Sequence, residues 1–377
     1  MYFIFCLCFL LGLLYVLYAC LAAYYWHKES DALQSDAHLL PLSIIILARN
    51  EEENIEDALN SIRACDYPED HFEIILMDDH SDDRTIERAE SLGWSSLKIL
   101  QLKDFDLGRW GHAYKKAALY YAVQSARHAH VLQMDADCTC SKNWMKQMQR
   151  QLHTSMVAVG PIDISDHSKG FLETWQTYES IGTMVSTFLG HRLDLWYSGA
   201  SANMGYHKEV YNNYIANHEP RQASGDDVFM LEHATSHKRK ISFVKSKDAV
   251  VKTAPVHSLG ALYRQRMRWA SKTTSYESSG LKIFMVAMAS YHILLVVSLI
   301  YVILTLGTGG SILILGAFTC KWLGDLLIIG PSASFFGHKY NPIISPIMSL
   351  AHAIYVCVIS ITATFKKDYK WKDRQVK

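Results

Sequence analysis

The sequence has no excess of charge: its 377 residues include 37 Lys and Arg and 37 Asp and Glu, so the formal net charge is zero. No basic field therefore favours a nucleic acid as a partner. The expected strands are not followed by a glycine-rich phosphate loop of the dinucleotide-binding or Walker type. If a nucleotide binds, it is not held by a glycine turn.

The sequence also lacks a cysteine framework. Five of its eight cysteines lie in apolar stretches, and Cys138 and Cys140 form an isolated CxC. Reduced thiols facing the cytosol explain these cysteines more simply than a metal site does. The 18 histidines contain no HExxH motif, so zinc is not expected.

Charged side chains are absent from residues 1–26, a stretch long enough to cross a bilayer. His27 and Lys28 follow at once, which favours a cytoplasmic position for this end. A cleaved signal peptide is the alternative, because "LYAC" ends at Cys20. Such a peptide starts with basic residues and stops being apolar at its cleavage site. This segment does neither, so we interpret it as a membrane anchor.

Further apolar stretches of membrane-spanning length lie near the C-terminus, at about 283–306, 311–330 and 343–365. Lys321 and Asp325 lie inside the second of them at i, i+4, and we expect them to pair with each other. If all three stretches cross, the basic tail 366–377 lies outside, against the usual placement of Lys and Arg. Either one stretch is re-entrant or the tail is an exception; we favour a cytoplasmic tail.

Between these membrane regions the composition is mixed and long enough for one sizeable α/β domain. Expected helices begin at Asn50 and cover 112–126, and they alternate with expected strands at 42–49, 72–77, 97–102 and 130–134. This alternation predicts βαβ units and a mainly parallel sheet flanked by helices.

Polar clusters follow three of these strands: Arg49–Asn50, Asp78–Asp79, and the pair Asp135 and Asp137 in "VLQMDADCTC". Ligands of parallel sheets bind beyond the carboxyl ends of the strands. Two carboxylates at i and i+2 can reach one Mg²⁺ or Mn²⁺ ion shared with substrate phosphates. A DxD alone is weak evidence, because Asp is common in turns.

Three later features add to this pattern. "SGASANMGY" (198–206) is a loop of small residues that lets a ligand approach the backbone closely. Asp226 and Asp227 open an expected helix. In "YRQRMRWA", Gln265, Arg268 and Trp269 are spaced i, i+3 and i+4, on one side of a helical turn.

Taken in order, DD, DxD, an acidic pair and QxxRW resemble the family 2 glycosyltransferases of GT-A fold, in their membrane-anchored branch, over about residues 42–270. The resemblance implies an inverting, metal-dependent transfer of a sugar from a nucleotide-diphosphate donor, a UDP-sugar in our prediction. It also implies a Mg²⁺ or Mn²⁺ cofactor.

The resemblance also implies roles for individual residues. The uracil pocket is assigned to Ala48, Asn50, Asp78 and Asp79, and the basic residue near the phosphates to Lys115 or Lys116. Asp135 is assigned to the nucleotide sugar and Asp137 to the metal ion. Asp227 matches the catalytic base, and the pyrophosphate and acceptor are assigned to Gln265, Arg268 and Trp269.

This sequence departs from the family pattern at two positions. The acidic pair is Gly-Asp-Asp instead of Glu-Asp, which leaves open whether Asp226 or Asp227 is the base. His80 replaces the usual glycine after the double aspartate.

We therefore expect an anchor at 1–26, a cytoplasmic catalytic domain at 27–252, an amphipathic interfacial helix at 253–282, a membrane region at 283–365 and a tail at 366–377. The expected partners are a nucleotide-sugar donor, a lipid or glycan acceptor and the membrane, with an oligomer or partner subunit as a source of further spans. A processive polysaccharide synthase of the same fold is the alternative, and a non-catalytic membrane scaffold is an alternative of another class.

Overall fold

The computed structural model describes residues 2–29, 38–166, 168, 170–218, 225–305, 310–365, 369–371 and 374–376. The chain divides into two compact units. The sheet unit comprises Ser30–His167 and Tyr197–Pro255, and the helical unit comprises Met1–Glu29, Ser168–Trp196 and Val256–Lys377. The grouping differs from the predicted boundaries at residues 168–196, because this segment forms a long helix that packs with the apolar helices. Which unit carries out catalysis stays a prediction.

A seven-stranded sheet forms the centre of the sheet unit, in the order β3-β2-β1-β4-β8-β6-β9. Its strands are β1 (Leu42–Ala48), β2 (Phe72–Asp78), β3 (Leu97–Gln101), β4 (His130–Asp135), β6 (Val157–Val159), β8 (Met204–His207) and β9 (Ile241–Phe243). Only β8 runs antiparallel to its neighbours, β4 and β6. The mainly parallel α/β sheet predicted from the sequence is confirmed.

The helices of the sheet unit are α2 (Ile55–Arg63), α3 (Thr85–Ser91), α4 (Tyr114–Ser125), α5 (Trp144–Leu152), α7 (Lys208–Asn217) and α8 (Asp226–Ser236). The helix expected from Asn50 begins only at Ile55. Asn50 has a left-handed backbone (φ 52°), which Asn tolerates, and its side-chain oxygen accepts a hydrogen bond from the Asp82 N–H. Residues 50–54 therefore form a turn tied to the loop after β2.

A second, three-stranded sheet has the order β5-β10-β7, from β5 (Cys138–Cys140), β10 (Val251–Thr253) and β7 (Ile162–Ile164). β10 pairs antiparallel with β5 and parallel with β7. Because β4 ends at Asp135 and β5 begins at Cys138, the predicted DxD forms the turn that links the two sheets.

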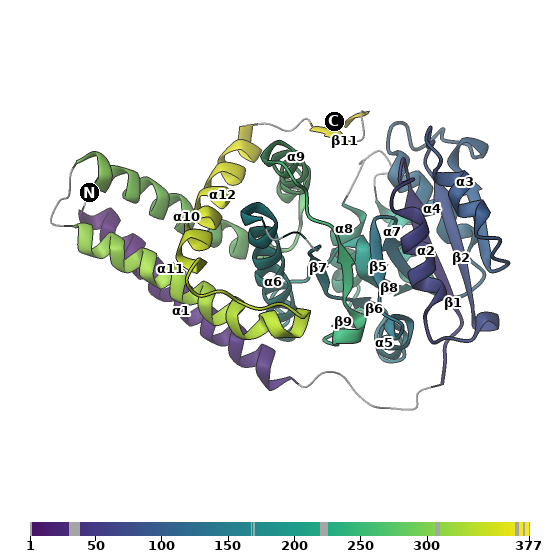
Figure 1. Ribbon diagram of the computed structural model, residues 1–377, viewed down its shortest axis with the longest axis horizontal. Helices are drawn as coiled ribbons and strands as arrows, with labels where there is room; N and C mark the ends of the chain where they lie inside the picture. The colour runs from purple at the N-terminus through teal and green to yellow at the C-terminus, as the bar shows by residue number, and fades with distance from the viewer. Residues whose placement is uncertain are drawn as a thin grey trace. The chain divides into compact units, whose positions relative to one another are not determined.

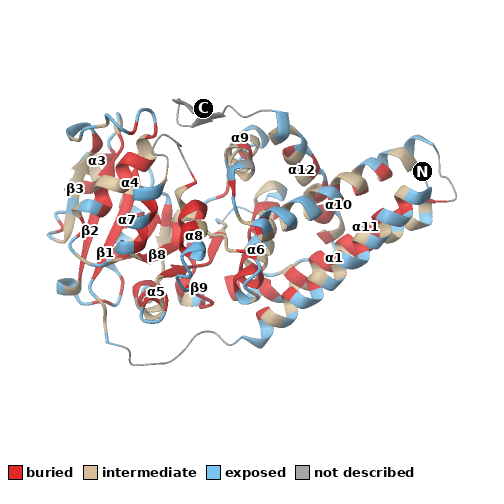
Figure 2. Cartoon of the chain, turned by 180° about the vertical axis from the view of Figure 1, so that it is seen from behind, coloured by how far each residue is buried: buried red, intermediate tan, exposed pale blue. Residues whose placement is uncertain are grey.

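The core of the sheet unit is built on β1 and β2, which are buried along nearly their whole length (Figure 2). Ile44, Ile45 and Ile46 are fully buried, so side chains on both faces of β1 are covered, as expected for a central parallel strand. Each such side chain contributes about 1.5–3 kcal/mol by leaving water. This packing fixes where the loops after β1, β2 and β4 begin.

In the part of the chain that the structure describes, four helices of the helical unit are long and apolar enough to cross a membrane. They are α1 (Tyr2–Lys28), α10 (Ser279–Leu304), α11 (Ser311–Ser332) with the short helix that continues it to Phe336, and α12 (Ser345–Phe365). α1 lies along α11 (Figure 1). Small residues allow this approach, since a Cβ at Gly324 would lie 2.4 Å from the Tyr15 ring.

The predicted pairing of Lys321 with Asp325 is confirmed: the Lys321 ammonium donates to the Asp325 carboxylate one turn away in α11. The Tyr15 hydroxyl of α1 donates to the other oxygen of Asp325 at 2.5 Å. The charged pair is therefore buried among helices instead of facing outward, as a charge within an apolar bundle requires.

Two further helices complete the helical unit, α6 (Phe171–Arg192) and α9 (Leu259–Ala270). In the tail, β11 (Tyr369–Trp371) pairs antiparallel with β12 (Arg374–Val376). The other residues of the predicted basic tail, 366–368, 372, 373 and 377, lie outside the described residues.

Candidate active site

The register of the central sheet brings three polar strand ends to one edge. β1 pairs with β2 so that Ala48 is opposite Asp78, and with β4 so that Leu47 is opposite Asp135. All three strands are parallel, so their carboxyl ends and the loops that follow lie at the same edge of the sheet. Asp78 of the double aspartate and Asp135 of the DxD motif therefore lie at this edge, and their roles stay predictions.

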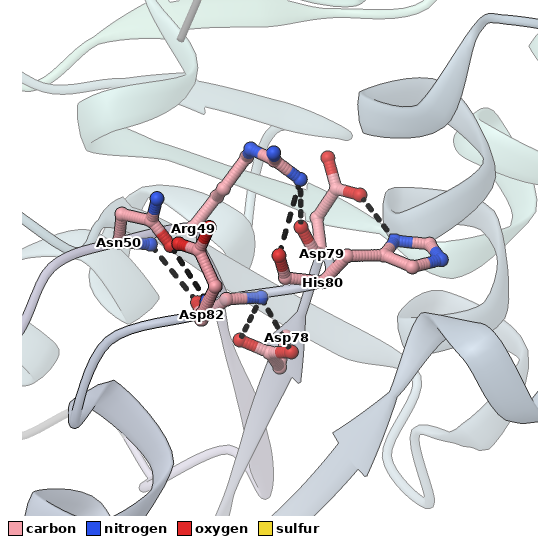
Figure 3. A network of polar contacts seen from close by, with 7 residues as sticks. Arg49, Asn50, Asp78, Asp79, His80 and Asp82 are labelled. Atoms are coloured by element: carbon pink, nitrogen blue, oxygen red, sulfur yellow. Dashed lines mark hydrogen bonds and ion pairs between the residues drawn. The ribbon is translucent and has the colours of Figure 1, made fainter. Parts of the chain in front are cut away.

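The loops after β1 and β2 are tied together by a polar network (Figure 3). Arg49 Nη1 donates to the backbone oxygens of Asp79 (2.8 Å) and His80 (3.2 Å). The Asn50 N–H donates to the Ser81 hydroxyl at 2.9 Å. The network holds Arg49 and Asn50 against the loop of the double aspartate.

Asp78 and Asp79 are both buried, at 2% and 3% exposure, but they are held differently. Both carboxylate oxygens of Asp78 accept from the Ser81 N–H, at 3.3 and 3.1 Å, which closes a turn. The Asp79 carboxylate lies 2.9 Å from Nδ1 of His80. Part of their carboxylate capacity is therefore used in shaping the loop.

His80 has a left-handed backbone (φ 57°). Glycine adopts this conformation without the steric cost that a side chain adds, which gives a physical reason for the usual glycine at this position. Here the imidazole contacts Asp79, and it forms a T-shaped pair with the Tyr114 ring, with centroids 5.7 Å apart. His80 thus adds a polar, aromatic side chain beside the double aspartate.

Asp83 holds the start of α3 through its carboxylate. Its carboxylate accepts from the Thr85 N–H at 2.9 Å and from the Glu52 N–H at 3.0 Å. These bonds join the turn before α2 to the start of α3.

The DxD turn presents two carboxylates of unequal environment. Asp135 is partly exposed, and the Lys115 ammonium lies 3.9 Å from its Oδ1. Asp137 is accessible to solvent, yet the surrounding protein, followed by the charges of Asp135 and Glu51, raises the pKa of its carboxyl. Negative charge at this turn is therefore only partly compensated by the chain itself.

A divalent cation fits this donor set. Hard cations take carboxylate oxygens, and Mg²⁺ is commonly held by one or two carboxylates together with substrate phosphates. Within the described residues, no group of three or more His, Cys, Asp or Glu side chains is placed to hold a metal by itself. Asp135 and Asp137 would therefore share the ion with a phosphate-bearing ligand.

The two adjacent lysines of α4 have different partners. Lys116 is fully buried, and its ammonium lies 3.2 Å from Oδ1 of Asp226, the first residue of α8. The Tyr214 hydroxyl of α7 donates to the same oxygen at 2.7 Å. Of the two lysines, Lys115 is the one that accompanies the DxD turn.

Asp227 is held differently from Asp226. Its Oδ1 accepts from the Val228 N–H at 2.9 Å, and among the described residues no side chain bonds to its carboxylate. Among the described residues, the Asp226 carboxylate therefore contacts an ammonium and a phenol, whereas the Asp227 carboxylate accepts from the Val228 N–H alone. This difference favours Asp227 for the role of base that the sequence left open between them.

The small-residue loop 198–206 has a packing role. A Cβ at Gly205 would lie 2.8 Å from Leu132, and one at Gly199 would lie 3.0 Å from Val159. Within the loop, buried Asn203 donates to the Pro161 and Ala249 backbone oxygens at 2.7 and 2.8 Å. Small residues are thus required by the core, and a ligand role for this loop stays a prediction.

The QxxRW residues lie in α9, in the helical unit. Gln265 Oε1 is buried and has no hydrogen-bond partner among the described residues. Trp269 is 39% exposed, and the Arg266 guanidinium stacks 4.2 Å from its ring centroid. The roles assigned to Gln265, Arg268 and Trp269 stay predictions.

Sequence reasoning missed three contributors to these sites: Tyr214, Glu51 and the ion pair of Arg266 with Glu179. Tyr214 lies on a helix face whose aromatic pattern is typical of core packing, so nothing in the sequence marks its hydroxyl. Glu51 is one of three consecutive glutamates, and only the fold shows that its charge acts on Asp137.

Residues 43–214 match the family model described as glycosyl transferase family 2. Over this segment the chain is similar to a family 2 glycosyltransferase domain. The matched segment runs from β1 into α7, so it includes the double aspartate, both lysines and the DxD turn.

Curated relatives of the family 2 domain are also glycosyltransferases by name. Glycosyltransferase AglE of Haloferax volcanii is 30% identical over 108 residues, which is 28% of this chain and 33% of AglE. The 4,4'-diaponeurosporenoate glycosyltransferase of Staphylococcus aureus is 31% identical over 159 residues, 41% of this chain and 39% of that protein. The chain thus matches about a third to two fifths of the length of these relatives.

Among solved structures, the mannosyltransferase PcManGT from Pyrobaculum calidifontis, in complex with GDP-Man and Mn²⁺, aligns with 97% of this chain and 99% of its own, at a TM-score of 0.60 and 15% identity. This likeness confirms the GT-A-like fold. The predicted membrane-anchored branch and the residue roles stay predictions.

Proposed function

We propose that this protein is a membrane-bound glycosyltransferase that transfers a sugar from a nucleotide-diphosphate donor to a lipid or other membrane-associated acceptor. The observation that carries the proposal is the row of Ala48, Asp78 and Asp135 at the carboxyl edge of β1, β2 and β4. This row lies in the segment that matches family 2, and ligands of such sheets bind at that edge. The comparisons support a glycosyltransferase enzyme, and the four apolar helices support the membrane-associated acceptor.

At the donor end, Asp78 and Asp79 with Arg49 and Asn50 form a rigid polar floor that can face a nucleobase. Lys115 lies beside the DxD turn and brings a positive charge to the side where a diphosphate would lie. Asp135 and Asp137 would hold a Mg²⁺ or Mn²⁺ ion, whose chemistry when bound is to offset the charge of the departing diphosphate. A donor held by these residues would present its anomeric carbon to a hydroxyl that attacks from the face opposite the diphosphate.

At the acceptor end, Asp227 takes the proton of the attacking hydroxyl. Its carboxylate lies in the first turn of α8 and, among the described residues, accepts only from the Val228 N–H, which leaves its other oxygen to accept from a substrate hydroxyl. Positioned general-base help is worth about 10²–10⁴-fold. A single base opposite the leaving group makes the transfer inverting. Gln265, Arg268 and Trp269 keep the roles that the motif implies.

The experiment is transfer by the full-length protein in detergent or lipid, with radiolabelled UDP- and GDP-sugars and either Mn²⁺ or Mg²⁺. Lipid extracts serve as acceptor, and Asp227→Asn is the matched inactive control. Cation-dependent release of nucleoside diphosphate, lost in Asp227→Asn, supports the proposal. Absence of transfer and hydrolysis with every donor would favour the scaffold alternative.

The length of the product separates the two enzymatic alternatives. A single transferred sugar supports the proposed activity, and a ladder of products indicates a processive polysaccharide synthase.

A further inference from the structure

We propose that Lys116 is a positioning residue for the catalytic base and does not bind the donor: together with Tyr214 it engages Asp226 and leaves Asp227 to take the acceptor proton. The inference rests on the proposed glycosyl transfer. It separates two neighbouring lysines that the sequence treats as equivalent.

Lys115 and Lys116 point in different directions. Consecutive residues of an α-helix point about 100° apart, so the two ammonium groups contact different partners. Lys115 keeps 28% of its side chain exposed and approaches Asp135, while the side chain of Lys116 is 1% exposed and approaches Asp226. A ligand at the DxD turn is therefore within reach of Lys115, and Lys116 is directed into the protein.

The ion pair with Asp226 holds Lys116 in place. A buried ammonium is costly unless it is paired and hydrogen-bonded, so Lys116 would lose the counter-charge of Asp226 if it turned toward a bound diphosphate. The Tyr214 ring, 5.7 Å from the Lys116 nitrogen, adds a favourable cation–π contact. Lys116, Asp226 and Tyr214 join α4, α8 and α7 at one point.

The phenol of Tyr214 is in its protonated form. Burial, and then the charge of Asp226, raise the pKa of this phenol well above its ordinary value. Tyr214 therefore stays protonated at neutral pH, and its hydroxyl donates a hydrogen bond to Asp226 Oδ1 at 2.7 Å. With a phenol and an ammonium on the same carboxylate, Asp226 has little capacity left to accept a proton from a substrate.

The contact between Lys116 and Asp226 also affects the neighbouring carboxylate, that of Asp227. Asp226 and Asp227 are consecutive in the first turn of α8, which the chain enters through Gly225 in a left-handed conformation (φ 105°). Lys116 and Tyr214 hold the Asp226 carboxylate and so anchor this turn, which fixes the direction of the neighbouring Asp227.

The test compares Lys116→Met with Lys115→Met as a matched control on the same helical turn. We expect Lys116→Met to lower kcat by about 10²-fold while the donor KM and the nucleotide affinity change less than about threefold, because only the base is misplaced. Lys115→Met is expected to raise the donor KM instead. A Lys116→Met variant with impaired donor binding and wild-type kcat would overturn the inference.

Two further variants test the inference even if Lys116→Met alone does not fold. Tyr214→Phe keeps the ring and removes only the hydroxyl, and it should lower kcat several-fold with an unchanged donor KM. Asp226→Asn combined with Lys116→Met should be no slower than the slower single variant, because the two groups act as one unit. Effects on kcat that multiply in the double variant would contradict the inference.

Failure of the inference and failure of the proposed function are distinguishable. A wild-type protein that transfers no sugar overturns both. An active wild type whose Lys116→Met variant loses donor affinity and keeps turnover overturns the inference alone.

Discussion

Arg266 of α9 and Glu179 of α6 form a buried ion pair, with Nη2 of the arginine 2.8 Å from Oε2 of the glutamate. Their side chains are 1% and 11% exposed. Burial raises the pKa of the Glu179 carboxyl, and Arg266 opposes that rise. Because Arg266 lies between Gln265 and Arg268, this pair fixes which face of α9 those two residues occupy.

Glu179→Gln should destabilise the protein by about 3 kcal/mol, because it leaves the Arg266 guanidinium buried without its counter-charge. The measurement is thermal unfolding in detergent, followed by tryptophan fluorescence. Arg264→Met, an exposed arginine on the same helix, is the control and should change little. Equal losses of stability in the two variants would show that the ion pair of Arg266 with Glu179 does not stabilise the protein.

Glu73 provides a pH-dependent test of the sheet unit. Burial opposes ionisation of this carboxyl, but hydrogen bonds from Ser43 Oγ (2.6 Å), the Arg127 N–H (2.6 Å) and Arg127 Nε (3.0 Å) outweigh it. The pKa of Glu73 is therefore held below its usual value. A carboxyl whose pKa is lower in the folded state stabilises the fold above its unfolded pKa, and this contribution is lost as pH falls through the folded pKa.

Glu73→Gln should cost about 2 kcal/mol at pH 7, the scale of hydrogen bonds to a charged group. The difference from wild type should begin to shrink as pH falls below about 4.3, where the unfolded chain takes up this proton, and should shrink further as pH falls through the lower folded pKa of Glu73. Midpoints of thermal unfolding from pH 7 to about pH 3 test this. A difference that stays constant or grows on acidification would contradict the assigned network.

The pair of Lys321 and Asp325 gives a third prediction, in the apolar helices. Lys321→Leu alone should destabilise the protein by about 3 kcal/mol, because it removes the ammonium that pairs with the buried Asp325 carboxylate. Replacing both residues by Leu should cost less than this single change. Thermal unfolding of the three proteins in one detergent is the measurement, and a double variant less stable than Lys321→Leu would refute the pairing.

Much of the sheet unit could be predicted, because strand, helix and carboxylate patterns repeat along the chain. β1, β2 and β4 lie within one or two residues of their expected ranges, and each ends at its predicted polar cluster. The error at Asn50 has a local cause: acidic residues there are typical of a first helical turn, but the left-handed Asn50 joins the loop after β2. The periodicity of the sequence does not indicate a hydrogen bond of this kind, because the bond joins residues far apart in the chain.

The partners of individual side chains could not be predicted in the same way. Lys115 and Lys116 read as a pair in sequence, and only the packing of α4 against α7 and α8 assigns Lys116 to Asp226. Arg266 interrupts an apolar arc, and nothing in the sequence identifies Glu179, 87 residues earlier, as its partner. Long-range pairs of this kind depend on the fold, whereas strand ends depend on local pattern.

The central claim is a division of labour between Asp137, which holds a cation with the donor, and Asp227, which takes the acceptor proton. Calorimetric titration of nucleoside diphosphate with and without Mn²⁺, combined with turnover, tests it on Asp137→Asn and Asp227→Asn. We predict that Asp137→Asn loses the cation-dependent affinity, while Asp227→Asn keeps that affinity and loses about 10³-fold in kcat. Cation-dependent binding that survives in Asp137→Asn, or wild-type turnover in Asp227→Asn, would contradict the account.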